Sequence, residues 1–413
     1  MKKIASLILT LLLTFSLTAC GGSDVALTSA ISLSDGVKSD IIEYSYYDRD
    51  FTASQNKLAL EIFAETAPQN TDRNVLISPI SLTYVLGMLT NGADRETLNE
   101  LTALLNADAE TTNHNVYSFF DALPKSSSVT NTSSVWIKDS NDFNVKDSFL
   151  KANANFYCAD IFKLPFEQNA ITDINNWVKS ATNGEITSIV NEIDRRTCLY
   201  LINALTFEAE WHSPYSKSDI TNGIFKMPNG TKQVQMMASK ENYYINTGNA
   251  TGFIKEYKNG DYRFIALLPS EALDINEYIK TLKNDSIANI IEKAYERNVT
   301  AVMPKFSSTF ETSFDEALQN LGVTTAFNQD KADFSKLGSY RGGNLYLSNV
   351  LQKTYISVDE KGTMAGAVTK AEISVKTSLE ERPVTVTLDR PFVYAIVEAK
   401  SNIPIFIGKV VEP

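Results

Sequence analysis

Histidine and cysteine are scarce in this sequence, and their scarcity excludes much chemistry. The 413 residues include two histidines, His114 and His212, and three cysteines. A zinc site of the usual His and Cys type would need nearly all of them in one place, and a serine hydrolase needs a histidine as base. The motifs CxxC, HExxH and GxSxG do not occur. We therefore expect no metal site, no cofactor and no hydrolase active site.

Acidic residues outnumber basic ones, which makes some classes of binding partner unfavourable. The chain has 38 Lys and Arg against 49 Asp and Glu, a formal net charge of −11 at pH 7. An acidic surface is repelled by nucleic acid and by anionic lipid headgroups. Hydrophobic residues make up 43% of the chain, which is enough for a sizeable core. The composition predicts a globular protein that does not bind nucleic acid.

The N-terminus carries an apolar run, residues 4–17, that is too short for a membrane-spanning helix. The basic pair Lys2-Lys3 precedes the run, and Leu-Thr-Ala-Cys20 ends it. This order resembles a bacterial lipoprotein signal, so we predict a signal peptide over residues 1–19 and a lipid on Cys20. Several lipid chains together would anchor the protein stably. The alternative is an ordinary secretory signal that happens to end near a cysteine.

The remaining boundaries follow from composition and periodicity. Residues 20–47 are rich in Ser, Asp and Gly, which predicts a flexible tether. Helical spacing of apolar residues begins near Asn56, and no linker divides the rest, so residues 48–413 are predicted to form one domain. We expect an exported protein of the cell envelope, held at the outer membrane or cell surface only by its lipid anchor.

Cys158 and Cys198 leave one structural question open. The two could form a disulfide in an oxidising compartment. Cys198 lies in a strand-like run, and free cysteines are commonly buried as small apolar residues. We favour a buried free thiol for each.

Helical and strand-like patterns are equally common along the chain. Apolar residues at helical spacing predict helices that include residues 144–158, 171–182 and 276–294. Runs rich in β-branched and aromatic residues predict strands that include residues 199–207 and 392–411. No internal repeat is present. The pattern predicts a single mixed α/β domain of the α+β class.

Several short motifs occur in an order that belongs to a known family. They lie at residues 74–81, 201–207 with Trp211, 225–230, 302–306, 358–363, 389–392 and 406–413. Together they resemble the serpin family of serine protease inhibitors, from about Gln55 to Pro413. The resemblance implies three β-sheets, about eight to nine helices and an exposed reactive-centre loop at about residues 360–383.

The resemblance implies a trap rather than an enzyme. A serine protease would cleave the loop as a substrate and form a covalent acyl-enzyme. The cleaved loop would then insert into the main sheet and carry the protease with it. The hinge from which such a loop inserts is matched by Glu360, Gly362, Thr363, Ala365 and Ala367. We expect a monomer whose partners are serine proteases.

The loop's own residues can be tested against insertion, because a strand alternates its two faces. With Thr363 facing inward, the inward set holds no charge and is mostly small: Thr363, Ala365, Ala367, Thr369, Ala371 and Ile373. Both charges, Lys370 and Glu372, then face outward, and a shift by one residue would bury them. No proline, which would remove a ladder hydrogen bond, occurs before Pro383. A flexible loop that never inserts would not need this alternation.

The position of the cleaved bond is implied by the family's spacing from Glu360. That spacing gives Lys376–Thr377, and a lysine before the bond suits trypsin-like proteases. Cleavage at Val375–Lys376 would suit elastase-like proteases instead. Arg382 is a further basic candidate.

Two groups of residues match positions that control the sheet in serpins. Ser78, Ser81 and Asn203 match the shutter, a polar cluster under the centre of the sheet, and Trp211 matches the breach, where the loop enters. The histidine that the family usually has in the shutter is Gln352 here, and an amide can donate and accept hydrogen bonds but cannot become charged. Ser78 would also serve as a simple helix cap, with proline at the first helical position.

Three functions compete for this sequence. An inhibitory serpin agrees with the small, uncharged hinge. A serpin that is cleaved without trapping, or that serves as a binding module, usually carries bulky or charged hinge residues. A lipid-anchored hydrolase lacks the necessary motif. The sequence favours the inhibitor, and it leaves the natural target protease open, whether from a host or from the bacterium itself.

Overall fold

The computed structural model describes most of the chain. The described residues are 27–35, 37, 46–124, 128–139, 143–193, 199–341, 343–363 and 382–413. Several predicted sites lie outside these ranges, namely Cys20, Cys198, Ala365, Ala367, Val375, Lys376 and Thr377. Within the ranges, no helix is both long and apolar enough to cross a membrane.

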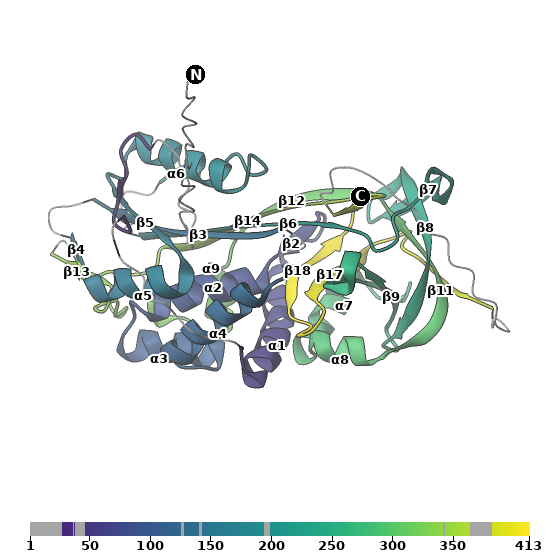
Figure 1. Ribbon diagram of the computed structural model, residues 1–413, viewed down its shortest axis with the longest axis horizontal. Helices are drawn as coiled ribbons and strands as arrows, with labels where there is room; N and C mark the ends of the chain where they lie inside the picture. Colours follow the sequence, from purple (N-terminus) through teal and green to yellow (C-terminus); the bar gives the residue numbers. More distant parts are fainter. Residues whose placement is uncertain are drawn as a thin grey trace, which may run out of the picture.

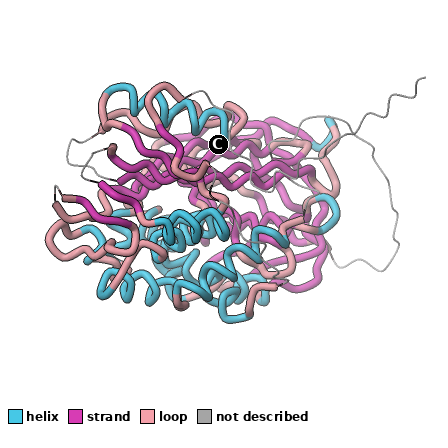
Figure 2. Tube along the Cα trace, turned by 60° about the vertical axis from the view of Figure 1, so that its left-hand side comes forward, coloured by secondary structure: helices cyan, strands magenta, loops and turns pink. Residues whose placement is uncertain are grey.

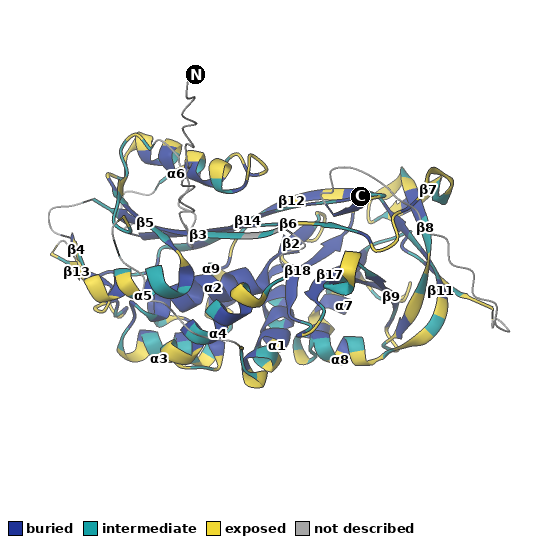
Figure 3. Ribbon diagram, viewed as in Figure 1, coloured by how far each residue is buried: buried dark blue, intermediate teal, exposed yellow. Residues whose placement is uncertain are grey.

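Nine α-helices occur in the described residues, and most of them lie against one face of a large sheet (Figure 1). They are α1 (Arg49–Thr66), α2 (Pro79–Thr90), α3 (Arg95–Leu105), α4 (Ala109–Ala122), α5 (Asp147–Tyr157), α6 (Gln168–Ala181), α7 (Ile275–Thr281), α8 (Ile287–Glu292) and α9 (Asp315–Asn320). Helix α2 is buried at every position (Figure 3). Helix α6 stands apart on the opposite face of the sheet, and α7 and α8 pack beside α1 (Figure 1).

The single helix predicted over residues 276–294 is wrong, because the structure divides it. Helix α7 is followed by a short 3-10 turn over Leu282–Asn284, and α8 begins only after Ser286. The Ser286 hydroxyl accepts a hydrogen bond from the amide of Asn289 at 3.1 Å. A serine that bonds to a nearby backbone amide favours the start of a new helix over continuation of the old one.

The first sheet has seven strands and contains the hinge. Their spatial order is β1 (Ile31–Ser32), β5 (Asp160–Leu164), β3 (Ser128–Lys138), β6 (Leu199–Glu210), β15 (Gly362–Thr363), β14 (Asn349–Val358) and β12 (Phe306–Ser313). Strands β6 and β14 are far apart in the sequence but run side by side in parallel. Figure 2 shows these strands lying between the helices of the two faces.

The second sheet has nine strands. Along the sheet they are β16 (Val384–Thr387), β11 (Ala294–Pro304), β8 (Gly230–Asn246), β9 (Ala250–Glu256), β10 (Tyr262–Pro269), β17 (Phe392–Glu398), β18 (Pro404–Val410) and β2 (Val75–Ile77), with β7 (Ile220–Met227) paired to β8. The strand predicted over residues 392–411 is a buried antiparallel hairpin of β17 and β18. A two-stranded sheet of β4 (Phe143–Val145) and β13 (Gly338–Tyr340) completes the fold. The predicted mixed architecture with three sheets is confirmed.

A small hydrophobic core, separate from the main one, fixes α6 to the first sheet. Trp136, Trp177 and Ile202 are fully buried in it. The rings of Trp136 and Trp177 meet edge to face, with centroids 6.1 Å apart. Leu351 of β14 packs against the same core. Helix α6 therefore covers the sheet where β6 and β14 meet.

Part of the predicted tether is attached to the domain. Strand β1 adds to the edge of β5. Asp173 on α6 accepts hydrogen bonds of 2.7–3.1 Å from the backbone and hydroxyl groups of Thr28 and Ser29 and from the amide of Ala30. Residues 28–32, called the N-terminal clasp below, thus join the edge of the sheet to α6. Serine, one of the residue types that suggested a flexible segment, here supplies hydrogen-bond donors together with threonine.

The buried free thiol favoured for Cys158 is wrong. Cys158 is exposed and disulfide-bonded. It lies just past the end of α5 in a left-handed conformation, with φ of 42°. The left-handed residue at its C-terminus ends α5 at Cys158, which the helical periodicity of residues 144–158 did not predict.

Candidate functional site

The first sheet is partly open between β6 and β14. The two strands pair in parallel from Asn349 opposite Tyr200 to Thr354 opposite Leu205. In the described part of the two strands, no further pair between them follows Thr354. Instead β15 lies between them at the far end, where Thr363 pairs with Val358 on one side and with Ala209 on the other. The hinge therefore occupies the end of an opening whose two edges come from β6 and β14.

A tight turn brings the chain back from β14 into this opening. The Asp359 carboxylate accepts hydrogen bonds from the amides of Lys361 (2.8 Å) and Gly362 (3.2 Å). The amide of Asp359 donates to the carbonyl of Gly362 at 3.0 Å. A Cβ atom at Gly362 would lie 2.1 Å from the carbonyl oxygen of Ala209. Only glycine permits this close approach of the two backbones.

Three backbone carbonyls of the turn are held by Trp211 and Tyr215. The indole N–H of Trp211 donates to the carbonyl of Asp359 at 2.9 Å. The backbone amides of Trp211 and Tyr215 donate to the carbonyls of Lys361 and Glu360, each at 2.8 Å. The predicted breach residue Trp211 thus contacts the hinge directly. Sequence reasoning missed Tyr215, because a lone tyrosine after a strand carries no pattern.

Glu360 is held by a cation that the sequence reasoning did not assign to the hinge. Its carboxylate lies 2.7 Å from the Lys305 ammonium, and both side chains are partly exposed. The hydrogen bond from Lys305 lowers the pKa of Glu360. A partly exposed pair of this kind contributes about 1 kcal/mol or less. Lys305 belongs to the motif at residues 302–306, so family resemblance was the signal available.

Thr363 points inward, as the proposed insertion register requires. Its side chain is fully buried, and its hydroxyl lies 2.6 Å from that of Tyr257. The Tyr257 ring stacks on Trp211, with centroids 4.4 Å apart and planes 16° apart. Burial raises the pKa of Tyr257 well above its usual value, so the phenol stays protonated. Ala365 and Ala367, the next inward positions of the hinge, lie outside the described residues.

Gln352 clamps β14 to the start of α2. Its side-chain oxygen accepts a hydrogen bond from the Ser78 amide (2.8 Å), and its NH₂ group donates to the Ser78 carbonyl (3.0 Å). The Ser78 hydroxyl also accepts a hydrogen bond from the amide of Ser81, and Pro79 stands at the first helical position. Ser78 therefore serves both as a helix cap and as a partner of the sheet.

Asn203 extends this polar cluster to β6 and β3. Its side chain lies directly against the Ser81 hydroxyl. Its NH₂ group donates to Asn131 and to Ser133, both at 2.8 Å. Asn203 is also the strand partner of Gln352 across the β6–β14 pair. The four predicted shutter residues therefore lie together, beneath the last pairs before the sheet opens.

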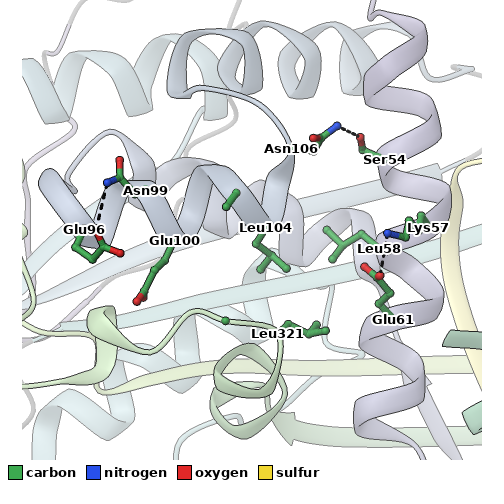
Figure 4. Close-up of a pocket in the computed structure, with 12 residues that line it drawn as sticks. Ser54, Lys57, Leu58, Glu61, Glu96, Asn99, Glu100, Leu104, Asn106 and Leu321 are labelled. Carbon is green, nitrogen blue, oxygen red and sulfur yellow. Dashed lines mark hydrogen bonds and ion pairs between the residues drawn. The ribbon is translucent and has the colours of Figure 1, made fainter. Parts of the chain in front are cut away.

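A cavity of about 640 Å³ lies elsewhere, between α1 and α3 (Figure 4). Its rim carries carboxylates that already have partners. Glu61 pairs with Lys57 at 3.3 Å, and Glu100 accepts hydrogen bonds from Thr324 and Thr325. Across the described ranges, no group of three or more His, Cys, Asp or Glu side chains could hold a metal ion.

The comparison with protein families agrees with this geometry. Residues 53–413 match the family model described as serpin (serine protease inhibitor). The chain belongs to the serpin family. The family and its relatives, which include named protease inhibitors, support a protease-inhibitor function.

Solved structures and relatives show how closely this serpin is matched. Native tengpin, a thermophilic serpin, is 42% identical with a TM-score of 0.88, covering 94% of this chain and all of that one. Latent tengpin gives a TM-score of 0.76, with 90% of this chain covered and 99% of that one. Serpin B10 of Sorex araneus is 34% identical over 58% of this chain, which spans 62% of that protein. Leukocyte elastase inhibitor A of Mus musculus is 26% identical over 87% of this chain and 99% of that protein. The serpin therefore resembles the native form of tengpin more than the latent form.

Proposed function

We propose that this serpin inhibits serine proteases as a suicide substrate that traps the acyl-enzyme. The observation that carries the proposal is the position of Thr363, which is paired with β14 on one side and β6 on the other. The bait loop continues from this residue. Cleavage of the loop would free it to extend β15 along the opening, one residue after another.

The chemical step uses the protease's own nucleophile. Its serine oxygen attacks the carbonyl carbon of Lys376, an ester forms there, and the bond between Lys376 and Thr377 breaks. Thr377 leaves as a new amino terminus and takes up a proton. Hydrolysis of the ester would return an active protease, so the trap depends on insertion being faster than hydrolysis.

Insertion requires the six β6–β14 pairs, from Asn349–Tyr200 to Thr354–Leu205, to separate. The inserted strand gains hydrogen bonds along both of its edges, so the sheet ends with more ladder bonds than it began with. Residues 363–376, at roughly 3.3 Å each, would move the attached protease by about 45 Å. A displacement of this size is comparable to the length of the inhibitor domain.

The residues before the bond decide which proteases are trapped. Lys376 suits the acidic specificity pocket of trypsin-like proteases. Val375 suits elastase-like proteases, and the name of one relative, leukocyte elastase inhibitor A, is in line with that second specificity. Arg382, the further basic candidate, is exposed.

The N-terminal sequence supports a location for this inhibitor. We propose that a lipid on Cys20 holds the exported serpin at the cell envelope, at the outer membrane or the cell surface. Replacing Cys20 with alanine should release the protein from the membrane fraction. Retention of the variant in that fraction would contradict the anchor without affecting the proposed mechanism.

Denaturing gel electrophoresis tests the trap. The domain from residue 23 is mixed separately with trypsin and with neutrophil elastase, then boiled. We expect a band that survives boiling, at the summed mass less the C-terminal fragment. Mass spectrometry of that fragment distinguishes a start at Thr377 from a start at Lys376. Cleavage of the loop with no such band would mean that the protein is a substrate of these proteases and does not trap them.

A further inference from the structure

A buried lysine lies directly behind the residues that hold the hinge. The Lys255 side chain is 2% exposed and its ammonium lies 2.9 Å from Glu241, itself only 12% exposed. The Ser239 hydroxyl, 2.6 Å from the same carboxylate oxygen of Glu241, supports the pair. Burial of an ammonium group is unfavourable unless its partners are well placed, and no feature of the proposed mechanism so far explains this lysine.

Lys255 makes three contacts within the five residues 211–215. Its ammonium lies 5.3 Å from the centre of the Trp211 ring and 4.5 Å from the centre of the Tyr215 ring. It also donates a hydrogen bond of 3.3 Å to the carbonyl of Ser213, which lies between the two aromatic residues. A cation attracts the faces of aromatic rings, more strongly where water is excluded. One ammonium group therefore fixes both rings and the backbone between them.

The same five residues supply the donors that hold the hinge. The indole N–H of Trp211 and the amides of Trp211 and Tyr215 bind the carbonyls of residues 359–361. Lys255 also lies two positions before Tyr257, whose ring stacks on Trp211 and whose hydroxyl contacts Thr363. Lys255 and Tyr257 therefore both contact the indole of Trp211. Lys255 thus contacts both residues, Trp211 and Tyr215, whose N–H groups bind the hinge carbonyls.

We infer that Lys255 is a positioning residue for the hinge of the bait loop. It acts through residues 211–215 and does not itself touch the loop. Its paired charge keeps Trp211 and Tyr215 oriented so that the start of the loop stays seated between β6 and β14. The position of the hinge between β6 and β14 is a property of the free protein and does not depend on the proposed function. Only the effect of Lys255 on protease trapping rests on that function.

Hydrogen–deuterium exchange of the uncomplexed protein tests this directly. In Lys255→Met, which keeps the length of the side chain but removes the charge, the backbone amides of Trp211, Tyr215 and Gly362 should exchange at least about tenfold faster than in the wild type. Lys409→Met is the matched control. Lys409 is also a fully buried lysine, but its ammonium bonds to Asn276 on α7. In that variant the same amides should keep their protection.

A double variant separates positioning from the simple penalty of an unpaired carboxylate. Lys255→Met with Glu241→Gln removes both charges, so it should fold even if the single variant does not. We expect the hinge amides of the double variant still to exchange faster than those of the wild type. Wild-type protection in the double variant would overturn the inference, because only the stranded glutamate would then have mattered. No protease is present, so the result stands even if the wild type traps none.

Discussion

The hydroxyl groups of Thr363 and Tyr257 lie 2.6 Å apart at the buried end of the opening between β6 and β14. This contact fixes which face of the bait loop enters the sheet. Thr363 is fully buried, and the residue after it begins the segment that would have to follow the same path. The alternation of small residues along that segment therefore has a defined starting point.

Replacing Thr363 with arginine should convert the inhibitor into a substrate. Thr363 is already buried between β6 and β14 before cleavage, so an unpartnered guanidinium there would be expelled from the opening and the cleaved loop would lose the pair from which its insertion begins. The fraction of protease in the boil-resistant band should fall at least tenfold, while loop cleavage continues. Thr363→Val, of the same shape, should keep most of the trapping. Normal complex formation by the arginine variant would show that the insertion register is wrong.

Gln352 should contribute to native stability through its two bonds to Ser78. In Gln352→Met, the buried amide and carbonyl of Ser78 lose a partner each, so the free energy of unfolding should fall by about 1–3 kcal/mol. Urea denaturation measures the change. Gln233→Met, at an exposed position on β8, is the control and should stay within about 0.5 kcal/mol. Equal values for the two variants would refute the role of the clamp.

Asp173 should stabilise the serpin through the N-terminal clasp. Burial opposes its ionisation, but the hydrogen bonds from Thr28 and Ser29 outweigh this effect and lower the pKa of Asp173. The contribution to stability should therefore be complete above the unfolded pKa of about 3.9 and be lost as the pH falls through the lower folded value. Asp173→Asn should lower the free energy of unfolding at pH 7 by about 1–3 kcal/mol and remove this part of the acid dependence.

A truncation provides the control for that prediction. Without residues 1–35, Asp173 loses its donors, so Asp173→Asn should have little further effect in the shortened protein. Such non-additivity is expected only if the two changes remove one and the same interaction. Additive losses would mean that Asp173 stabilises α6 by itself.

The sequence predicted those parts of the site that depend on local pattern or on family motifs. The alternation that begins at Thr363 was proposed because side chains in a strand have a period of two, and of its inward positions Thr363 is the one within the described residues. Ser78 and Asn203 were found through motifs, and Gln352 by its match to the family's shutter histidine. Trp211 was found in the same way, and the structure places its indole N–H on the hinge itself.

Other parts depend on contacts between distant segments, which no local pattern reveals. Thr28 and Asp173 are 145 residues apart, and the clasp was assigned to a tether. Lys255 lies in a strand of the second sheet, and it is linked to the hinge through its contacts with residues 211–215, which are about 40 positions away in the sequence. The break between α7 and α8 has a different, local cause: the Ser286 hydroxyl caps the start of α8, and this capping outweighs the helical periodicity on which the prediction was based.

The central claim is that the cleaved loop enters the sheet between β6 and β14, and a crystal structure of the protein after loop cleavage tests it most directly. We predict that residues 363–376 form a strand there, with Thr363 still facing Tyr257. The pairs now joining Asn349–Thr354 to Tyr200–Leu205 should be replaced by pairs with the inserted strand. A cleaved protein in which those β6–β14 pairs persist and the loop lies outside the sheet would contradict the account.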